Sequence, residues 1–358
     1  MSHGGMSRRL VEFSNALIGH WSSGLAMVSI LASMFFAAIT GSAIAASAAI
    51  GGLMIPLMID EGYDARFAAP LISTAGSIGP IIPPSIPLLV YGVTTNNSVA
   101  ELFMAGVVPG IIMGIALMLI SYYFGKKRNY RGRETKAEFS EILKSGKSAV
   151  LALLTPIIII GGIFSGLFTA TESGVVAVVY AFLIGKLVYK ELTWTKLVDC
   201  LRDSVITTGQ VLIVVAMATV FTWFITFNQI PQQLAALITS VVSSKIGLLL
   251  IINAVLLFTG TFIDTVSNVV IFSPLFLPLA LQFGVDPIHF GVILAVNLTI
   301  GMCTPPLGVC LFVTSSIADI SIGKMMRDLI PMLIVLLIVL GIITYIPQSV
   351  LWLPNLFN

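Results

Sequence analysis

Long apolar runs with almost no charge recur along the chain and are separated by short polar segments. Residues 107–124, 148–164 and 329–346 are clear examples. An α-helix needs about 20 mainly apolar residues to cross the hydrocarbon core of a bilayer. Runs of this length exceed what a buried strand needs. The pattern therefore predicts an all-α polytopic membrane protein.

The apolar pattern repeats in the second half of the chain. When Pro56 is aligned with Pro278, the two halves match without gaps as far as Pro109 and Pro331. Chance would align apolar residues with each other, but not a register of proline, glycine and aspartate. The matched pairs include Gly62 with Gly284, Asp64 with Asp286, Gly79 with Gly301, and Pro83-Pro84 with Pro305-Pro306. The sequence therefore predicts an internal repeat.

Each copy of the repeat contains two interrupted elements. An apolar segment reaches a small polar tip, at 40–43 in the first copy and 260–265 in the second, and a further apolar segment returns. This pattern predicts a re-entrant helical hairpin. Helices at 67–95 and 288–318 are each broken by a proline pair, because proline lacks a backbone donor and disfavours helix before it. A plain kink is the alternative, but paired breaks in two halves of a membrane protein point to a transporter site.

The distribution of basic residues predicts the orientation in the membrane. Segment 125–147 contains eight Lys or Arg, so the positive-inside rule places it in the cytoplasm. An amphipathic helix on the inner leaflet would give the same orientation. Counting the membrane crossings from this segment predicts that the two repeats have opposite orientations in the membrane, so that they are inverted repeats. The predicted divisions are a first repeat at 1–124 with a span at 102–124, connecting spans at 148–245, and a second repeat at 246–358 with a final span at 327–353.

Composition restricts the possible functions. Hydrophobic residues make up 57% of the 358 residues and charged residues only 9%, and the net charge of +2 gives no basis for a nucleic-acid partner. Cys200, Cys303 and Cys310 have neither a disulfide pattern nor metal-ligand spacing and are expected to be free thiols. The sequence carries no P-loop or dinucleotide fingerprint. We expect no catalytic residues, and an ion gradient rather than ATP as the energy source.

The tips and breaks provide two kinds of binding group. Half-helix N-termini offer free N–H groups and a partial positive charge, which suit carboxylates. Half-helix C-termini and unwound carbonyls offer hard oxygens, which suit Na⁺. Hydroxyl groups that can serve either purpose are carried by Ser42, Ser85, Thr261, Thr265 and Thr304. Any ion at the first tip or break must be held mostly by neutral oxygens, since neither contains Asp or Glu.

Asp264 is the one carboxylate within the second hydrophobic hairpin. Intramembrane ionisable residues are expensive and usually functional, which favours substrate or ion binding. The alternative is a helix cap at the tip, and the two roles can coexist. Glu172 is more simply interpreted as a first-turn residue at a helix start, where its charge suits the helix dipole.

Several of these motifs together resemble the large membrane subunit of tripartite ATP-independent periplasmic (TRAP) transporters. The resemblance extends over essentially the whole chain. Its motifs are Gly41-Ser42-Ala43-Ile44-Ala45, Gly79-Pro80-Ile81-Ile82-Pro83-Pro84-Ser85-Ile86-Pro87, Thr171-Glu172, Ile230-Pro231-Gln232-Gln233 and Thr304-Pro305-Pro306-Leu307-Gly308. It implies an elevator-type fold in a bacterial inner membrane. It also implies Na⁺-driven uptake of an organic acid, with a small membrane subunit and a periplasmic binding protein as partners.

The family's binding residues can be placed on this sequence position by position. The resemblance implies that Ser42, Ser85 and Asp264 face the substrate. It implies one Na⁺ site at Gly41, Ser42, Pro84 and Ser85, and another at Gly260, Thr261, Met302 and Thr304. Dicarboxylates, sugar acids and sialic acids would all suit such a site, so the acid is left open, as are the Na⁺ stoichiometry and the oligomeric state.

Two departures from the family pattern are visible. Family members usually have a first span and membrane-surface helices ahead of the position of Met1, so we expect this sequence to lack that part. Ala170 stands where the family often has proline. Alternative functions are a stand-alone Na⁺- or H⁺-coupled carrier, a non-transporting membrane scaffold or receptor subunit, and an intramembrane enzyme.

Overall fold

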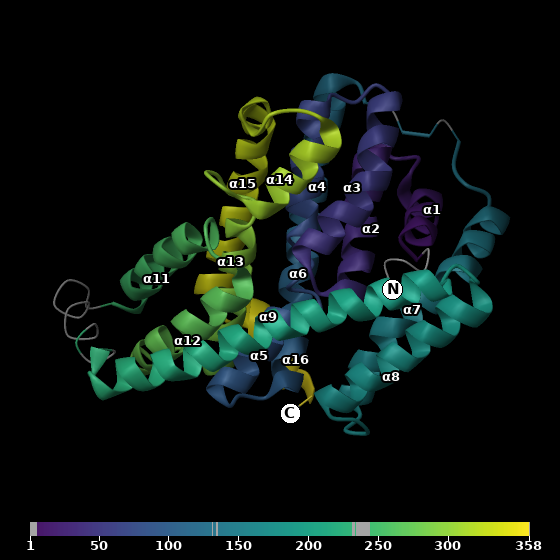
Figure 1. The fold of residues 1–358 in the computed structure, drawn as a ribbon. Coiled ribbons are helices and arrows are strands. Elements are labelled where there is room, and N and C mark those ends of the chain that lie inside the picture. Colours follow the sequence, from purple (N-terminus) through teal and green to yellow (C-terminus); the bar gives the residue numbers. More distant parts are fainter. Residues whose placement is uncertain (1–5, 131, 134, 231–232, 234–243, 358) are drawn as a thin grey trace.

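The computed structural model describes residues 6–130, 132–133, 135–230, 233 and 244–357, and the secondary structure in these ranges is entirely helical. Figure 1 shows the helices as one bundle with a longer helix across its outside. The elements are α1 Met6–Ile18, α2 Gly24–Thr40, α3 Ala43–Asp60, α4 Ala65–Gly76, α5 Ile86–Thr95, α6 Val99–Arg128, α7 Phe139–Phe164, α8 Ala170–Leu183, the π-helix η2 Ile184–Val188, α9 Trp194–Phe227, α11 Lys245–Gly260, α12 Thr265–Gln282, α13 Pro287–Gly301, α14 Val309–Ala318, α15 Ile322–Tyr345 and α16 Gln348–Phe357.

Seven of the described helical stretches are long and apolar enough to cross a membrane. They are α3, α6, α7, α8 with η2, α9, α12 and α15. Five shorter apolar helices, α2, α5, α11, α13 and α14, have 10–17 residues. Together with α3, α4 and α12, the shorter helices form the arms of the hairpins and the halves of the broken helices. The prediction of an all-α polytopic membrane protein is confirmed.

Capping residues form the two hairpin tips. Helix α2 ends at Gly41, whose φ of +60° is the left-handed conformation that commonly ends a helix. Ser42 then caps α3, and its hydroxyl accepts a hydrogen bond from the Ala45 amide at 3.3 Å. In the second hairpin, Asp264 caps α12 by accepting from the Val266 amide at 2.9 Å. Local sequence alone therefore directs the chain to turn back at both tips.

The two broken helices stop at glycines and resume beyond the proline pairs. Helix α4 ends at Gly76 and α5 begins after the cap residue Ser85, whereas α13 ends at Gly301 and α14 begins after Gly308. The bonds Pro83–Pro84 and Pro305–Pro306 are both cis. The helical interruptions predicted within 67–95 and 288–318 are therefore present at the expected positions.

Helices from the two halves interlock around a common core. Helix α3 packs against α4 of its own half and α14 of the other, and α12 packs against α13 and α5 in the corresponding way. Helix α4 likewise contacts α15, and α13 contacts α6. Helices α4 and α13 are buried along most of their length and lie inside the bundle (Figure 1). The internal repeat and the inverted orientation of its two halves stay predictions.

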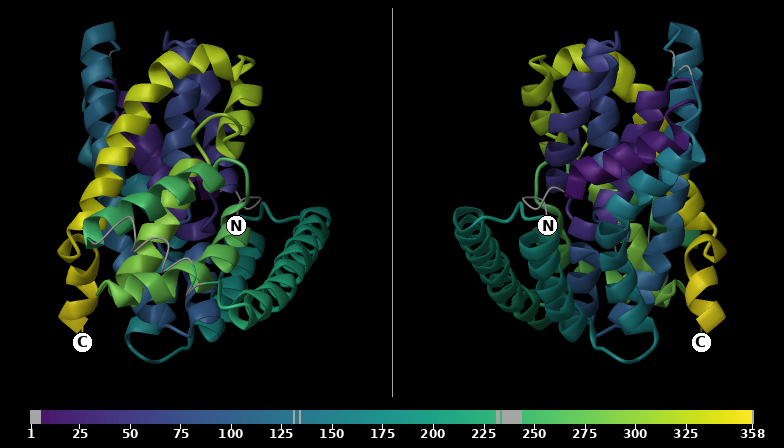
Figure 2. Two further views of the ribbon diagram at one scale, coloured as in Figure 1. Left: turned by 90° about the vertical axis from the view of Figure 1, so that its left-hand side faces the viewer. Right: turned by 90° about the vertical axis from the view of Figure 1, so that its right-hand side faces the viewer.

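Helices α7, α8 and α9 form a peripheral group. Helix α7 packs against α1 and α8, and α9 makes its main contacts with α12. Only 11% of the apolar stretch of α9 is buried within the protein, whereas 50% of the corresponding stretches of α6 and α15 is buried. Figure 2 shows these teal helices on one flank of the bundle. The interlocked helices therefore form a compact core, and α9 covers one side of it.

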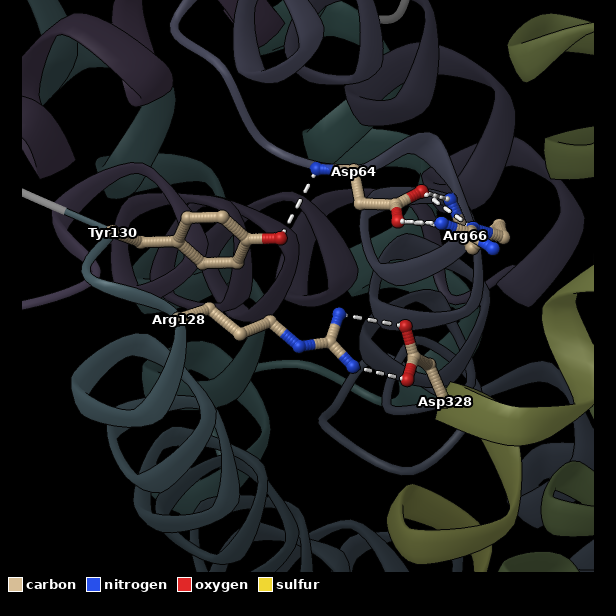
Figure 3. Close-up of polar contacts among 5 residues, drawn as sticks. All are labelled: Asp64, Arg66, Arg128, Tyr130 and Asp328. Atoms are coloured by element: carbon tan, nitrogen blue, oxygen red, sulfur yellow. Dashed lines mark hydrogen bonds and ion pairs between the residues drawn. The ribbon is translucent and has the colours of Figure 1, made fainter.

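A charged cluster joins the end of α6 to the start of α15 (Figure 3). The Arg128 guanidinium makes a bidentate contact with the Asp328 carboxylate, with 2.8 Å from Nη1 to Oδ2. The Tyr130 hydroxyl accepts from the Asp64 amide at 3.1 Å. Arg66 beside Asp64 holds the pKa of that carboxyl below its usual range. The cluster ties elements of both halves together at one end of the core.

Some predicted boundaries differ from the helix ends. The predicted final span 327–353 is divided between α15 and α16, because Pro347 has no amide to continue the helix. Within the predicted basic loop 125–147, α6 continues to Arg128 and α7 begins at Phe139. Pro231 and Gln232 of the predicted motif lie outside the described residues.

Candidate functional site

Both hairpin tips and both breaks contribute to a cavity of about 430 Å³. Ser42 and Asp264 approach it from the two tips, Pro80 comes from the first break and Met302 from the second. Ligand pockets commonly have volumes of about 300–1,000 Å³. The remaining lining residues are Gly41, Ala43, Ile44, Ile86, Pro87, Thr207, Gln210, Val211, Val214, Thr265, Val266 and Ser267. The cavity is therefore large enough for a small organic molecule.

Three helices begin at this cavity. The lining includes the first residues of α3 (Ala43 and Ile44), of α5 (Ile86 and Pro87) and of α12 (residues 265–267). The first turn of an α-helix carries backbone N–H groups without intrahelical partners and a partial positive charge. Three such ends around one cavity favour an anion. The tips thus present to the cavity the kind of helix end that the sequence predicted.

The structure separates the three residues predicted to face the substrate. Ser42 and Asp264 line the cavity, and the Asp264 carboxylate combines this position with its capping role. Ser85 is not among the lining residues and is 1% exposed. Its hydroxyl donates to the Pro80 carbonyl and accepts from the Leu88 amide at 3.2 Å. Ser85 therefore fixes the start of α5 rather than reaching into the cavity.

The first predicted Na⁺ site lies where the first tip touches the first break. A Cβ atom on Gly41 would overlap the Pro84 carbonyl oxygen, and one on Gly79 would lie 2.9 Å from the Ser42 carbonyl oxygen. Only glycine allows backbones to come this close. Gly41, Ser42, Pro84 and Ser85 therefore belong to one junction, rich in neutral oxygens of the kind that Na⁺ prefers.

The second predicted Na⁺ site occupies the corresponding junction. The backbones of Gly260 and Gly301 touch, because a Cβ on Gly260 would lie 3.3 Å from the Cα of Gly301. The Thr261 carbonyl accepts from the Gly308 amide at 3.3 Å. The Thr265 hydroxyl lies 2.9 Å from the Met302 sulfur. The hydroxyl of Thr304, by contrast, donates to the Ile300 carbonyl at 2.8 Å, so its side chain is occupied within the break.

Helix α9 contributes cavity residues that the sequence analysis missed. Thr207, Gln210, Val211 and Val214 form one stripe of this helix, at the spacing of residues that share a helical face. Thr207 also lines an adjoining cavity of about 500 Å³. The sequence feature that could have pointed to these residues was a Thr and a Gln three positions apart in an otherwise apolar span. Periodicity alone could not show which helix faces the tips.

The Glu172 interpretation is confirmed. Its carboxylate accepts from the Thr169 amide at 2.8 Å, and the Thr169 hydroxyl accepts from the Glu172 amide at 3.3 Å. This reciprocal pair is a capping box at the start of α8. Glu172 is thus committed to the helix end and does not line the cavity described above.

Comparison with known proteins identifies the family. A family model described as "Tripartite ATP-independent periplasmic transporter, DctM component" matches residues 1–349. The chain belongs to this family. Over 357 residues it is 43% identical to the sialic acid TRAP transporter large permease protein SiaM of Vibrio cholerae, covering 100% of this chain and 83% of SiaM. The resemblance to TRAP large subunits is therefore confirmed.

Other TRAP relatives carry different substrate names. The chain is 40% identical to the C4-dicarboxylate TRAP transporter large permease protein DctM of Pseudomonas aeruginosa, covering 99% of this chain and 83% of that protein. It is 41% identical to the isethionate TRAP transporter permease protein DctMQ of Oleidesulfovibrio alaskensis, covering 97% of this chain. It spans only 55% of the length of DctMQ. The chain is thus a multi-pass membrane protein of a transporter family whose members are named for different acids.

Proposed function

We propose that this chain is the large membrane subunit of a secondary transporter that takes up an organic acid driven by a Na⁺ gradient. The supporting observation is the cavity between the hairpin tips, where α3, α5 and α12 all begin. Their positive ends would hold the carboxylate of the substrate. Ser42 would add a hydroxyl group and Asp264 a hydrogen-bond acceptor for another part of the acid.

Na⁺ would bind at the two tip–break junctions that flank this cavity. The first junction would use oxygens of Gly41, Ser42, Pro84 and Ser85. The second would use oxygens of residues 260, 261, 302 and 304. Unwound backbone at membrane depth exposes carbonyl oxygens, and transporters use such oxygens to coordinate their coupling ion. An ion at each junction would draw tip and break together and so complete the substrate cavity.

The arrangement of helices supports an elevator movement. The hairpins and broken helices form the interlocked core, and α9 contacts it mainly through α12. A rigid core could slide past such a partner without unpacking itself. Relatives named as TRAP large permeases suggest a periplasmic binding protein and a small membrane subunit as partners. We place the assembly in the bacterial inner membrane.

Uptake in proteoliposomes tests this proposal. The full chain would be reconstituted with its small subunit and binding protein, and labelled malate, gluconate and N-acetylneuraminate would be offered with and without an inward Na⁺ gradient. We expect uptake of at least one acid, dependent on Na⁺ and lost in Asp264→Ala. Uptake without the binding protein would instead support a stand-alone carrier. No uptake of any acid, from a folded and correctly inserted complex, would contradict the proposed function.

A further inference from the structure

Gln210 occupies an unusual position on α9. At a rise of about 1.5 Å per residue, it lies about 10 Å along the helix from Asp203, the last charged residue of α9, inside the apolar part that follows. A polar amide at this depth is unfavourable unless it is hydrogen-bonded. Gln210 lines the tip cavity on the same stripe as Thr207 and Val214. Its side chain therefore faces the proposed substrate rather than only lipid.

The amide of Gln210 has no hydrogen-bond partner within the described part of the chain. Among the described residues, the hydroxyls of Thr207 and Ser267 likewise have no hydrogen-bond partner, whereas Asp264 and Thr265 are engaged. The Asp264 carboxylate accepts from the Val266 amide, and the Thr265 hydroxyl contacts the Met302 sulfur. An uncharged amide both donates and accepts, which suits a hydroxyl group better than a second carboxylate. Asp264 would repel a second carboxylate and accept a hydrogen bond from a hydroxyl.

We propose that Gln210 is a specificity-determining residue that hydrogen-bonds a hydroxyl group of the transported acid. The carboxylate lies at the N-termini of α3, α5 and α12, and the hydroxyl-bearing part lies between Asp264 and α9. The substrate is accordingly a hydroxylated organic acid rather than a plain dicarboxylate. This inference rests on the proposed function. It adds a residue of the peripheral helix α9 to a site otherwise built from the two halves of the core.

The test compares acids that differ by one hydroxyl group. Initial rates would be measured for malate and succinate, gluconate and 3-deoxygluconate, and N-acetylneuraminate and its 4-deoxy analogue, with the parent and Gln210→Leu. The same binding protein is present in every assay. Its selectivity therefore cancels when the initial rate of the variant is divided by that of the parent. We expect kcat/KM to fall about tenfold for the hydroxylated member of the transported pair, and less than about twofold for its deoxy partner.

Two further variants separate recognition from folding. Gln210→Asn keeps the amide and is expected to recover part of the preference for the hydroxylated acid. Thr219→Val makes a polar-to-apolar change on the same helix, where the Thr219 hydroxyl bonds only to the Val215 carbonyl, and should leave both members unchanged. Equal losses for both members in Gln210→Leu would overturn this inference alone. No uptake by the parent would overturn the proposed function and this inference with it.

Discussion

At the scale of single residues, glycine decides how closely a tip can approach a break. Gly41 has a left-handed backbone, and its α-carbon lies against the Pro84 carbonyl. Any other residue at this position would have a strained backbone. Its Cβ would also displace the Pro84 carbonyl, which can move only if the whole break moves. The same position ends α2, so one glycine serves both the turn and the junction.

Substitution of Gly41 by alanine tests this dual role. We expect Gly41→Ala to lower the free energy of unfolding by about 3 kcal/mol, from the left-handed strain and the overlap together, and to abolish most Na⁺-driven uptake. Gly52→Ala is the matched control, because no atom lies within 4 Å of its Cβ position in α3. That change should be neutral or stabilise by about 0.5–1 kcal/mol. Thermal unfolding in detergent measures the stability of each variant, and the uptake assay measures its transport. Equal stability and equal uptake of Gly41→Ala and Gly52→Ala would contradict the dual role of Gly41.

At the scale of elements, α9 has two different faces. One stripe, containing Thr207 and Gln210, borders the cavities, while most of the remaining helix is exposed. Asp203 and Thr208 join Thr207 around the adjoining cavity of about 500 Å³. Hydroxyl and carboxylate groups favour water in such a space. The two cavities share Thr207, and we expect them to form one water-containing passage along α9.

Cysteine labelling can test whether this passage contains water. In a Cys200→Ser background, Thr207→Cys should react with a membrane-impermeant thiol reagent at least about tenfold faster than Thr219→Cys, since only the thiolate in water is reactive. Saturating substrate should slow the reaction at position 207. Cys303 and Cys310 are buried and are expected to stay unmodified. Equal labelling of positions 207 and 219, or no protection by a transported acid, would argue against the passage.

At the scale of the whole molecule, contacts between the halves hold the core together. Packing of α3 on α14 and of α12 on α5 makes each half incomplete without the other. Arg128 and Asp328 add a bidentate ion pair between α6 and α15 (Figure 3). The Asp328 side chain is 5% exposed and that of Arg128 27%. A pair in this position is partly desolvated, so loss of one partner leaves an uncompensated charge.

A double-mutant cycle measures this link. Arg128→Ala and Asp328→Ala should each destabilise by about 3 kcal/mol, and the double variant by clearly less than the sum, because no unpaired charge is left behind. Arg8 and Glu12 form an exposed pair whose side chains are 80% and 52% exposed. The same cycle there should give a coupling below about 0.5 kcal/mol. Additive losses at Arg128 and Asp328 would show that the pair does not join the halves.

Much of the architecture was predictable because it depends on local chemistry. Apolar run length predicted the membrane-spanning helices, the proline pairs predicted the helix breaks, and the small polar segments at 40–43 and 260–265 predicted the tips. The end of the final span was misplaced because the effect of Pro347 was overlooked, although it too is local. Ser85 was predicted to face the substrate, but its hydroxyl donates a hydrogen bond to the Pro80 carbonyl and accepts one from the Leu88 amide. That outcome depends on how the break folds.

The sequence by itself determined the class of protein, the repeated elements and the residues at each tip, since these follow from hydropathy, helix capping and the backbone limits of proline and glycine. Only the tertiary structure decided which helix ends meet at one cavity. It brought α9 against the second hairpin and so placed Gln210 and Asp264 around the same cavity. Such encounters join residues more than 40 positions apart. They depend on the packing of helices around the core, which no local pattern records.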